Sequence, residues 1–166
     1  MHFYTSDYYL DTEIFRKLQV RFMNSKMRDF FDNRTFVSRD CGQPGDMGFE
    51  LNPEYADEIR SLILDPKVIL ERHKLRDLYM RKAEALLHAD FHTSNVFVGK
   101  DQLKAIDMEF TFFGPAAYDL GYLQANLLSQ CACGMFRSFP TQQARIAFVS
   151  FILSTMQQLY TEYCFI

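Results

Sequence analysis

The sequence predicts an α+β fold that is mostly helical and contains one small β-hairpin. Three observations lead to this prediction. Apolar residues recur at helical spacing over most of the chain, Pro and Gly mark helix boundaries, and one central stretch changes to a β-branched and aromatic pattern. With 166 residues, 48% hydrophobic and 23% charged, the chain has the size and composition of one globular domain.

Helices are predicted over the first half of the chain. Apolar residues of segment 11–31 fall near helical spacing after an Asp or Thr cap. Segment 40–53 contains three Gly and two Pro and is predicted to be a loop. One helix is expected from Pro53, and a longer one over 66–86. The side chains of the longer helix expected to be buried are Val68, Leu75, Leu78 and Tyr79.

The pattern changes at the centre of the chain. Short strands are predicted at 86–88, 96–98 and 104–107, with a turn at 99–101 between the last two. This loop–hairpin–loop unit is expected to bring Asp90 and Asp107 together near the strand ends. Two helices complete the fold, over about 115–130 and 141–165, with a linker from Gly134 to Pro140.

The central segment carries the candidate chemistry. Asp90 lies between His88 and His92, Asn95 follows, and Asp107 and Glu109 come after a short apolar run. Phosphoryl transfer needs one acid to orient and deprotonate a hydroxyl, and oxygen ligands for the metal that bridges the phosphates. Asp90 is the candidate base. Asp107, Glu109 and Asn95 are the candidate Mg²⁺ ligands, because Mg²⁺ prefers hard oxygen donors.

Other interpretations of these residues were weighed. An isolated Asp is often a backbone cap, and an acidic pair is often a solvated surface. His88 and His92 could share a helix face and bind zinc, but a third ligand is missing, so bracing the loop by hydrogen bonds is favoured. Asp119, early in an apolar helix, is expected to accept backbone N–H bonds from the Asp90 loop, because a buried carboxylate needs such partners.

Composition argues against several classes of protein. A net charge of −3 without a basic run gives no support for a nucleic-acid partner. The longest apolar stretch, 146–153, is far shorter than the ~20 residues that span a bilayer, and residues 1–7 lack the basic start and apolar core typical of a signal peptide. The spacing of Cys41, Cys131, Cys133 and Cys164 matches no disulfide framework. We therefore expect reduced thiols in a cytoplasmic protein that does not contact membranes.

Four segments resemble the methylthioribose kinases, a branch of the aminoglycoside/choline kinase-like phosphotransferases. Segment 88–95 resembles the family loop H-G-D-L-H-T-G-S, and 107–115 resembles D-P-E-F-A-F-Y-G-P. Segment 118–121 resembles F-D-[IV]-G, and 3–8 is similar to a region with S-S-D-Y. Ala89 stands where the family has Gly, and its methyl group could strain a loop that requires φ > 0. Met108 replaces Pro, and Ser94–Asn95 replaces Gly-Ser.

The resemblance implies the C-terminal lobe of a protein-kinase-like fold, with the hairpin at the catalytic loop. Because no glycine-rich phosphate loop joined to strands precedes His88, we expect the N-terminal lobe to be absent and residues 1–166 to form a single partial domain. Asp90 would bind and activate the 1-hydroxyl of 5-methylthioribose, a step of methionine salvage. Asp107, Met108 and Glu109 would bind ATP and Mg²⁺, and the family implies a homodimer. Two alternatives stay open: another acceptor such as choline, an aminoglycoside or another sugar, and a noncatalytic binding or dimerisation module.

Overall fold

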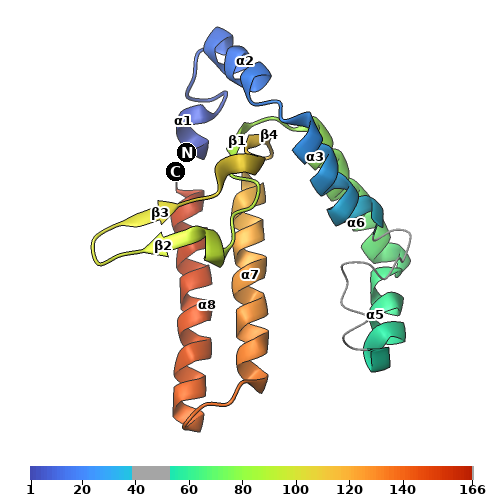
Figure 1. Cartoon of the computed structure of the whole chain (residues 1–166), viewed down its shortest axis with the longest axis vertical. Coiled ribbons are helices and arrows are strands. Elements are labelled where there is room, and N and C mark those ends of the chain that lie inside the picture. Colours follow the sequence, from blue (N-terminus) through green and yellow to red (C-terminus); the bar gives the residue numbers. More distant parts are fainter. Residues whose placement is uncertain (39–52, 166) are drawn as a thin grey trace.

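Helices make up most of the computed structural model, which describes residues 1–38 and 53–165 (Figure 1). The α-helices are α1 (His2–Thr5), α2 (Thr12–Arg21), α3 (Ser25–Asp32), α5 (Ala56–Ile63), α6 (Pro66–Arg81), α7 (Ala117–Phe136) and α8 (Gln142–Cys164). Shorter helical turns are η1 (Asn33–Val37), η3 (Pro53–Tyr55), η4 (Thr93–Asn95) and η5 (Met108–Phe110). The strands are β1 (Ala85–Leu87), β2 (Val96–Val98), β3 (Leu103–Ala105) and β4 (Phe112–Gly114). The predicted mostly helical α+β class is confirmed.

The helix predicted over 11–31 is two helices, so that prediction is wrong in its continuity. Asp11 does cap α2, since its carboxylate accepts the N–H of Glu13 at 2.8 Å. Helix α2 ends at Arg21, and Asn24 adopts a left-handed conformation, φ 38°, before α3 begins. Asn tolerates this region better than most residues. The apolar spacing continues across the break and therefore does not reveal it.

Helix α6 begins as predicted but ends earlier. Asp65 caps it by accepting the N–H of Lys67 at 2.8 Å. It stops at Arg81 instead of residue 86, because Ala85–Leu87 pair with β4 as a strand. Of the side chains predicted to be buried, only Tyr79 is, at 2% exposure. The exposed fractions of the others are 46% for Val68, 58% for Leu75 and 44% for Leu78.

That burial prediction failed because α6 is covered along a narrow strip. Among the described residues, its main packing partners are α5, η1 and β4. The apolar side chains of the helix are spread over a wider face than this strip, so several of them lie outside it. The loop predicted over 40–53 falls almost wholly on residues outside the described ranges.

The predicted β2–β3 hairpin is present, with Val96 opposite Ala105 and Val98 opposite Leu103. Its second strand ends at Ala105, so Asp107 lies beyond the strand and not within it as predicted. The sequence did not predict the second sheet, in which β1 pairs with β4 antiparallel. Gly114, directly before the helix predicted from about residue 115, is the last residue of β4.

Helices α7 and α8 form a long antiparallel pair (Figure 1). Helix α8 begins where predicted, and Thr141 caps it by accepting the N–H of Ala144 at 3.1 Å. Gly134 lies inside α7 and not in a linker, which corrects the predicted boundary. A Cβ at Gly134 would lie 2.7 Å from Cε1 of Phe148, so glycine allows the two helices to approach closely. Nowhere in residues 1–38 or 53–165 is a helix both long and apolar enough to cross a membrane.

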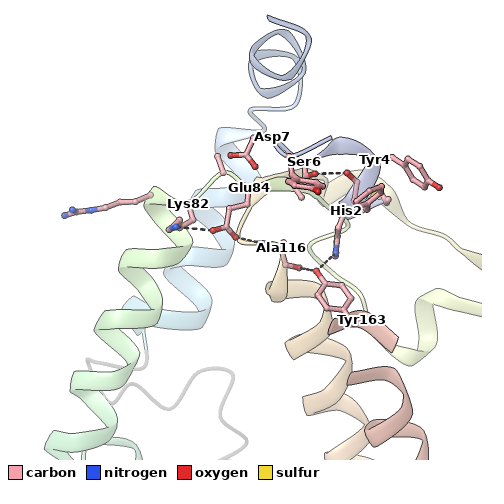
Figure 2. A pocket seen from close by; sticks show the side chains of 14 residues that line it. His2, Tyr4, Ser6, Asp7, Lys82, Glu84, Ala116 and Tyr163 are labelled. Atoms are coloured by element: carbon pink, nitrogen blue, oxygen red, sulfur yellow. Dashed lines mark hydrogen bonds and ion pairs between the residues drawn. The ribbon is translucent and has the colours of Figure 1, made fainter. Parts of the chain in front are cut away.

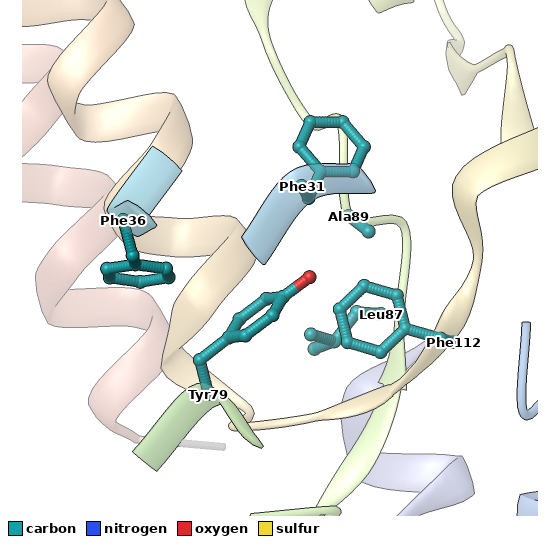
Figure 3. Packing of buried hydrophobic residues seen from close by; sticks show 6 residues of the cluster. All are labelled: Phe31, Phe36, Tyr79, Leu87, Ala89 and Phe112. Atoms are coloured by element: carbon teal, nitrogen blue, oxygen red, sulfur yellow. The ribbon is translucent and has the colours of Figure 1, made fainter. Parts of the chain in front are cut away.

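Two apolar clusters hold the fold together. The first lies under the loop that follows β1 (Figure 3), and its buried members are Phe31, Phe36, Tyr79, Leu87, Ala89 and Phe112. The second joins α7 to α8 through Leu127, Cys131 and Ile152. Arg28 ties α3 to the first cluster, because its Nη2 donates to the carbonyls of Tyr79 and Met80 at 2.6 Å. The first cluster thus fixes the position of β1 and of the loop residues that follow it.

We expect Gly114→Ala to destabilise the protein. A Cβ at Gly114 would lie 2.6 Å from Cδ1 of Leu87, a side chain with no exposed surface that cannot move aside. Overpacking of this kind costs about 1–3 kcal/mol in the free energy of unfolding, measurable by urea titration.

The matched control is Gly121→Ala on α7, where a Cβ would meet nothing within 4 Å. Helix propensity at this position predicts that the free energy of unfolding rises by up to about 1 kcal/mol. Equal effects of the two substitutions would contradict the close approach of β1 and β4.

Candidate active site

The loop after β1 is held by one buried carboxylate. Asp119 is 3% exposed, and its two oxygens accept the backbone N–H groups of His88 at 2.7 Å and of Ala89 at 2.9 Å. Asp119 lies in the first turn of α7, where the helix N-terminus favours a negative charge. These are the backbone hydrogen bonds that the sequence predicted for Asp119. What they contribute to catalysis stays a prediction.

Ala89 adopts the left-handed conformation, φ 70°, and is fully buried. The strain expected from its methyl group is therefore present in the backbone, at a cost of roughly 1–2 kcal/mol for an L-residue. The hydrogen bond from its N–H to Asp119 and its packing in the first cluster hold it in this conformation. This turn sets the direction of the next residue, Asp90.

The Asp90 carboxylate is partly exposed, with 17% of its side-chain surface accessible. Asn95 donates from Nδ2 to the Asp90 carbonyl at 3.0 Å and to its Oδ2 at 3.4 Å. His92 Nε2 lies 3.4 Å from the same oxygen. His92 Nδ1 accepts the N–H of Ser94 at 3.2 Å, so the proton of a neutral ring is on Nε2, facing Asp90. Donors from its own loop therefore orient the carboxylate.

Tyr122 on α7 is a site residue that the sequence analysis missed. Burial raises the pKa of its hydroxyl, and the charge of Asp90 and a hydrogen bond to Asp90 raise it further. Its ring is stacked on Tyr118 at 6.2 Å and lies 6.3 Å from the ring of His92. The available signal was the i, i+4 spacing of Tyr118 and Tyr122 beside Asp119, which puts both rings on one helix face.

Two hydrogen bonds join the segment that carries Asp107 to the Asp90 loop. His88 Nε2 donates to the Ile106 carbonyl at 2.7 Å, and the Ile106 N–H donates to the Asn95 carbonyl at 3.0 Å. Asp107 directly follows, in a left-handed conformation with φ 64°, and begins the η5 turn. The strand alternation that would have pointed Asp107 and Glu109 to opposite faces does not apply here. Both residues are exposed.

The oxygen donors at this junction suit a hard cation. Asn95 directs its amide nitrogen at Asp90, which leaves its Oδ1 as the donor available to a metal. Together with the Asp107 carboxylate this is the kind of donor set that Mg²⁺ takes, one or two carboxylates plus phosphate oxygens. Nowhere in the described ranges, this junction included, do three His, Cys, Asp or Glu side chains gather closely enough to hold a metal. His88 and His92 form hydrogen bonds of the kind predicted for bracing residues.

Two asparagines outside the motifs hold the site loops. Asn24 Nδ2 donates to the carbonyls of Glu109 at 3.0 Å and Thr111 at 3.2 Å. Asn126 Oδ1 accepts the Thr93 N–H at 3.3 Å and its hydroxyl at 2.6 Å. No local pattern marks either residue, because each acts on a segment more than thirty residues away in sequence.

Comparison with known proteins gives one family. Residues 40–138 match the profile of the phosphotransferase enzyme family. The methylthioribose kinase of Geobacillus kaustophilus (strain HTA426) is 35% identical over 136 residues, covering 76% of this chain and 31% of that protein. The methylthioribose kinase of Yersinia enterocolitica (serotype O:8 / biotype 1B, strain NCTC 13174 / 8081) is 31% identical over 137 residues, covering 80% and 32%. The chain thus spans about a third of the length of these relatives.

We expect Asp119→Asn to lower the free energy of unfolding by about 3 kcal/mol. The amide keeps one acceptor and places an NH₂ group against a backbone N–H, so at least one of the two loop bonds is lost. Urea titration measures the change, and Asp101→Asn in the exposed β2–β3 turn is the control. An unchanged stability of Asp119→Asn would contradict the bracing role.

Tyr118→Phe should reduce the alkaline loss of stability. Burial raises the pKa of the Tyr118 hydroxyl above its usual value, with contributions from Tyr122, Asp119 and Asp90. Above pH ~10 the unfolded chain loses this proton and the folded chain keeps it, so the free energy of unfolding falls as pH rises. The variant should flatten this fall by up to about 1.4 kcal/mol per pH unit.

Urea titrations at several alkaline pH values measure this slope. Tyr8→Phe is the control because Tyr8 is 86% exposed, and its slope should match that of the unmodified chain. If Tyr118→Phe leaves the slope unchanged as well, the folded hydroxyl does not retain its proton.

Proposed function

This chain belongs to the phosphotransferase enzyme family, and from that premise we propose that it transfers the γ-phosphoryl group of ATP to a hydroxyl group of a small molecule. The observation that carries the proposal is the junction of two loops. The partly exposed Asp90 carboxylate lies on one loop, and the His88–Ile106 bond ties that loop to the segment of Asp107. Phosphoryl transfer needs an acid for the hydroxyl and oxygen ligands for the phosphate-bound metal, and two loops tied together can supply both.

We propose 5-methylthioribose as the acceptor and its 1-hydroxyl as the group phosphorylated, a step in methionine salvage. Support comes from relatives named methylthioribose kinase at 31% to 35% identity. All the predicted site residues, from His88 to Asp119, lie inside the span that matches the family profile. Choline, an aminoglycoside or another sugar would use the same base and metal residues, so the acceptor is decided by assay.

In the proposed reaction Asp90 orients the acceptor hydroxyl and takes its proton. The hydroxyl oxygen then attacks the γ-phosphorus as the bond to the leaving ADP oxygen breaks. His92 Nε2 and Asn95 Nδ2 hold one carboxylate oxygen of Asp90. A base positioned in this way contributes about 10²–10⁴-fold to the rate.

Asp107 and Asn95 are proposed to bind Mg²⁺, with Glu109 as a further ligand. When bound, Mg²⁺ neutralises the charge on the phosphates. Met108 and Glu109 in the η5 turn, with Asp107 before it, are proposed to line the ATP site. His88, His92 and Asp119 would keep these loops in register. The assignment of residues 1–166 to a C-terminal lobe, the homodimer and the cytoplasmic location stay predictions.

The test compares ADP formation with and without the Asp90 carboxylate. The chain is incubated with ATP, Mg²⁺ and 5-methylthioribose, with choline and an aminoglycoside as competing acceptors, and ADP is measured. In parallel, residues of this chain replace the matched third of the Geobacillus kaustophilus enzyme. We expect the chimera to phosphorylate 5-methylthioribose, and Asp90→Asn to lower kcat by about 10²–10⁴-fold.

Asp101→Asn serves as the control and should retain activity. Turnover with another acceptor alone would keep the phosphotransferase and change its substrate. A folded but inactive chimera beside an active parent enzyme would contradict the proposal and favour a noncatalytic binding module.

A further inference from the structure

A chain of polar contacts outside the proposed reaction centre joins His2, Tyr163 and Ala116 (Figure 2) and continues to Asp119. His2 on α1 places Nε2 2.8 Å from Oδ2 of Asp119 and Nδ1 2.9 Å from the hydroxyl of Tyr163 on α8. The Tyr163 hydroxyl donates to the carbonyl of Ala116 at 2.6 Å. The Asp119 oxygen that faces His2 is the one that accepts the N–H of His88.

The donors and acceptors along this chain favour a charged His2. A carbonyl can only accept, so the Tyr163 proton points to Ala116, and the phenol oxygen must accept from His2 Nδ1. The Asp119 carboxylate can also only accept, so His2 Nε2 must donate to it. Both ring nitrogens then carry protons. A neutral ring would leave one of these contacts as two facing lone pairs.

We propose that His2 is a positioning residue that, as an imidazolium, holds the Asp119 carboxylate and through it the backbone of His88 and Ala89. Its effect on phosphoryl transfer rests on the proposed function, whereas its charge state does not. His2 comes from the far end of the sequence, 117 residues from Asp119, and sequence analysis gave it no role.

Burial and nearby charge support this arrangement. The side chains of His2 and Asp119 are 17% and 4% exposed, so water and salt screen the pair less than a surface pair. Burial raises the pKa of Tyr163, and the negative charges of Asp119 and Glu84 raise it further, so the phenol keeps the proton that it donates.

Other charged and titratable groups line the two cavities that His2 borders. They are the Met1 amino group, Tyr4, Asp7, Tyr8, Arg81, Lys82, Glu84, Asp119, Glu162 and Tyr163. Two of the three cations are already paired, Arg81 with Asp77 at 2.6 Å and Lys82 with Glu84 at 3.1 Å. Asp119 and Glu162 are the acids on the α7 and α8 side. The local balance therefore favours a positive ring.

Helix α1 is also attached to β1. Thr5 Oγ1 accepts the N–H of Leu86 in β1 at 3.0 Å, close to where β1 enters the catalytic loop. The larger cavity, about 890 Å³, borders His2 and Tyr163, so the ring can exchange protons with water. Losing the His2 proton would thus loosen α1, Asp119 and the catalytic loop together.

The direct test is ¹⁵N NMR of the full chain with labelled histidine, which has only four His to assign. The signals missing from His2→Gln identify His2. We expect both ring nitrogens of His2 to be protonated at neutral pH. A bare ring nitrogen at neutral pH would overturn the proposal. The protonation is measured on the unmodified chain, and the variant serves only to assign the signals.

The second test is amide hydrogen exchange at His88 and Ala89. His2→Gln keeps a donor but loses the charge, and it should speed exchange of these two amides by about tenfold, as for a weakened charge-assisted bond. His2→Arg restores a cation and should recover much of the protection. His73→Gln on α6 is the control and should change neither amide.

Unchanged exchange in His2→Gln would refute the coupling to the loop, and equal exchange in the Gln and Arg variants would refute the role of charge. None of these readouts requires turnover. An inactive chain with an imidazolium at His2 would count against the proposed function alone, and an active chain with a neutral His2 would count against this inference alone.

Discussion

The structure around the candidate site depends on the carboxylate of Asp119. It accepts two backbone N–H groups from the loop that precedes Asp90 and a third contact from His2. A buried carboxylate is stable only when such donors satisfy it, so the loop, α7 and α1 stabilise one another. Removing any one of the three leaves the others with unpaired polar groups. This mutual requirement makes the turn at Ala89 a single conformation.

Backbone strain in the described residues is concentrated at the same place. The non-glycine residues with positive φ are Asn24, Ala89 and Asp107. Ala89 precedes the proposed base, Asp107 is a proposed metal ligand, and Asn24 holds the carbonyls of Glu109 and Thr111 that follow. Each conformation costs free energy and persists because hydrogen bonds and packing over-determine it. Strain of this kind is typical of functional sites, where side chains must point in one particular direction.

Apolar packing supplies the platform for these polar contacts. The cluster around Tyr79, Leu87 and Phe112 lies directly under the strained loop, and Ala89 is one of its members (Figure 3). The second cluster, between α7 and α8, fixes the helix that carries Asp119 and Tyr122. Asp119 and the α8 residue Tyr163 thus reach His2 from two helices that pack on each other.

The sequence by itself determined the local features: the mostly helical class, the cap at Asp11, the helix starts near Pro66 and Thr141, the β2–β3 hairpin, and the residues that the family motif marks. These follow from the chemistry of neighbouring residues, which a linear pattern records. Only the tertiary structure decided the break at Asn24, the β1–β4 pairing, and the positions of Tyr122 and His2 beside Asp90 and Asp119. Those contacts join residues far apart along the chain, and their free energy exists only once the chain has folded, so no local pattern carries it.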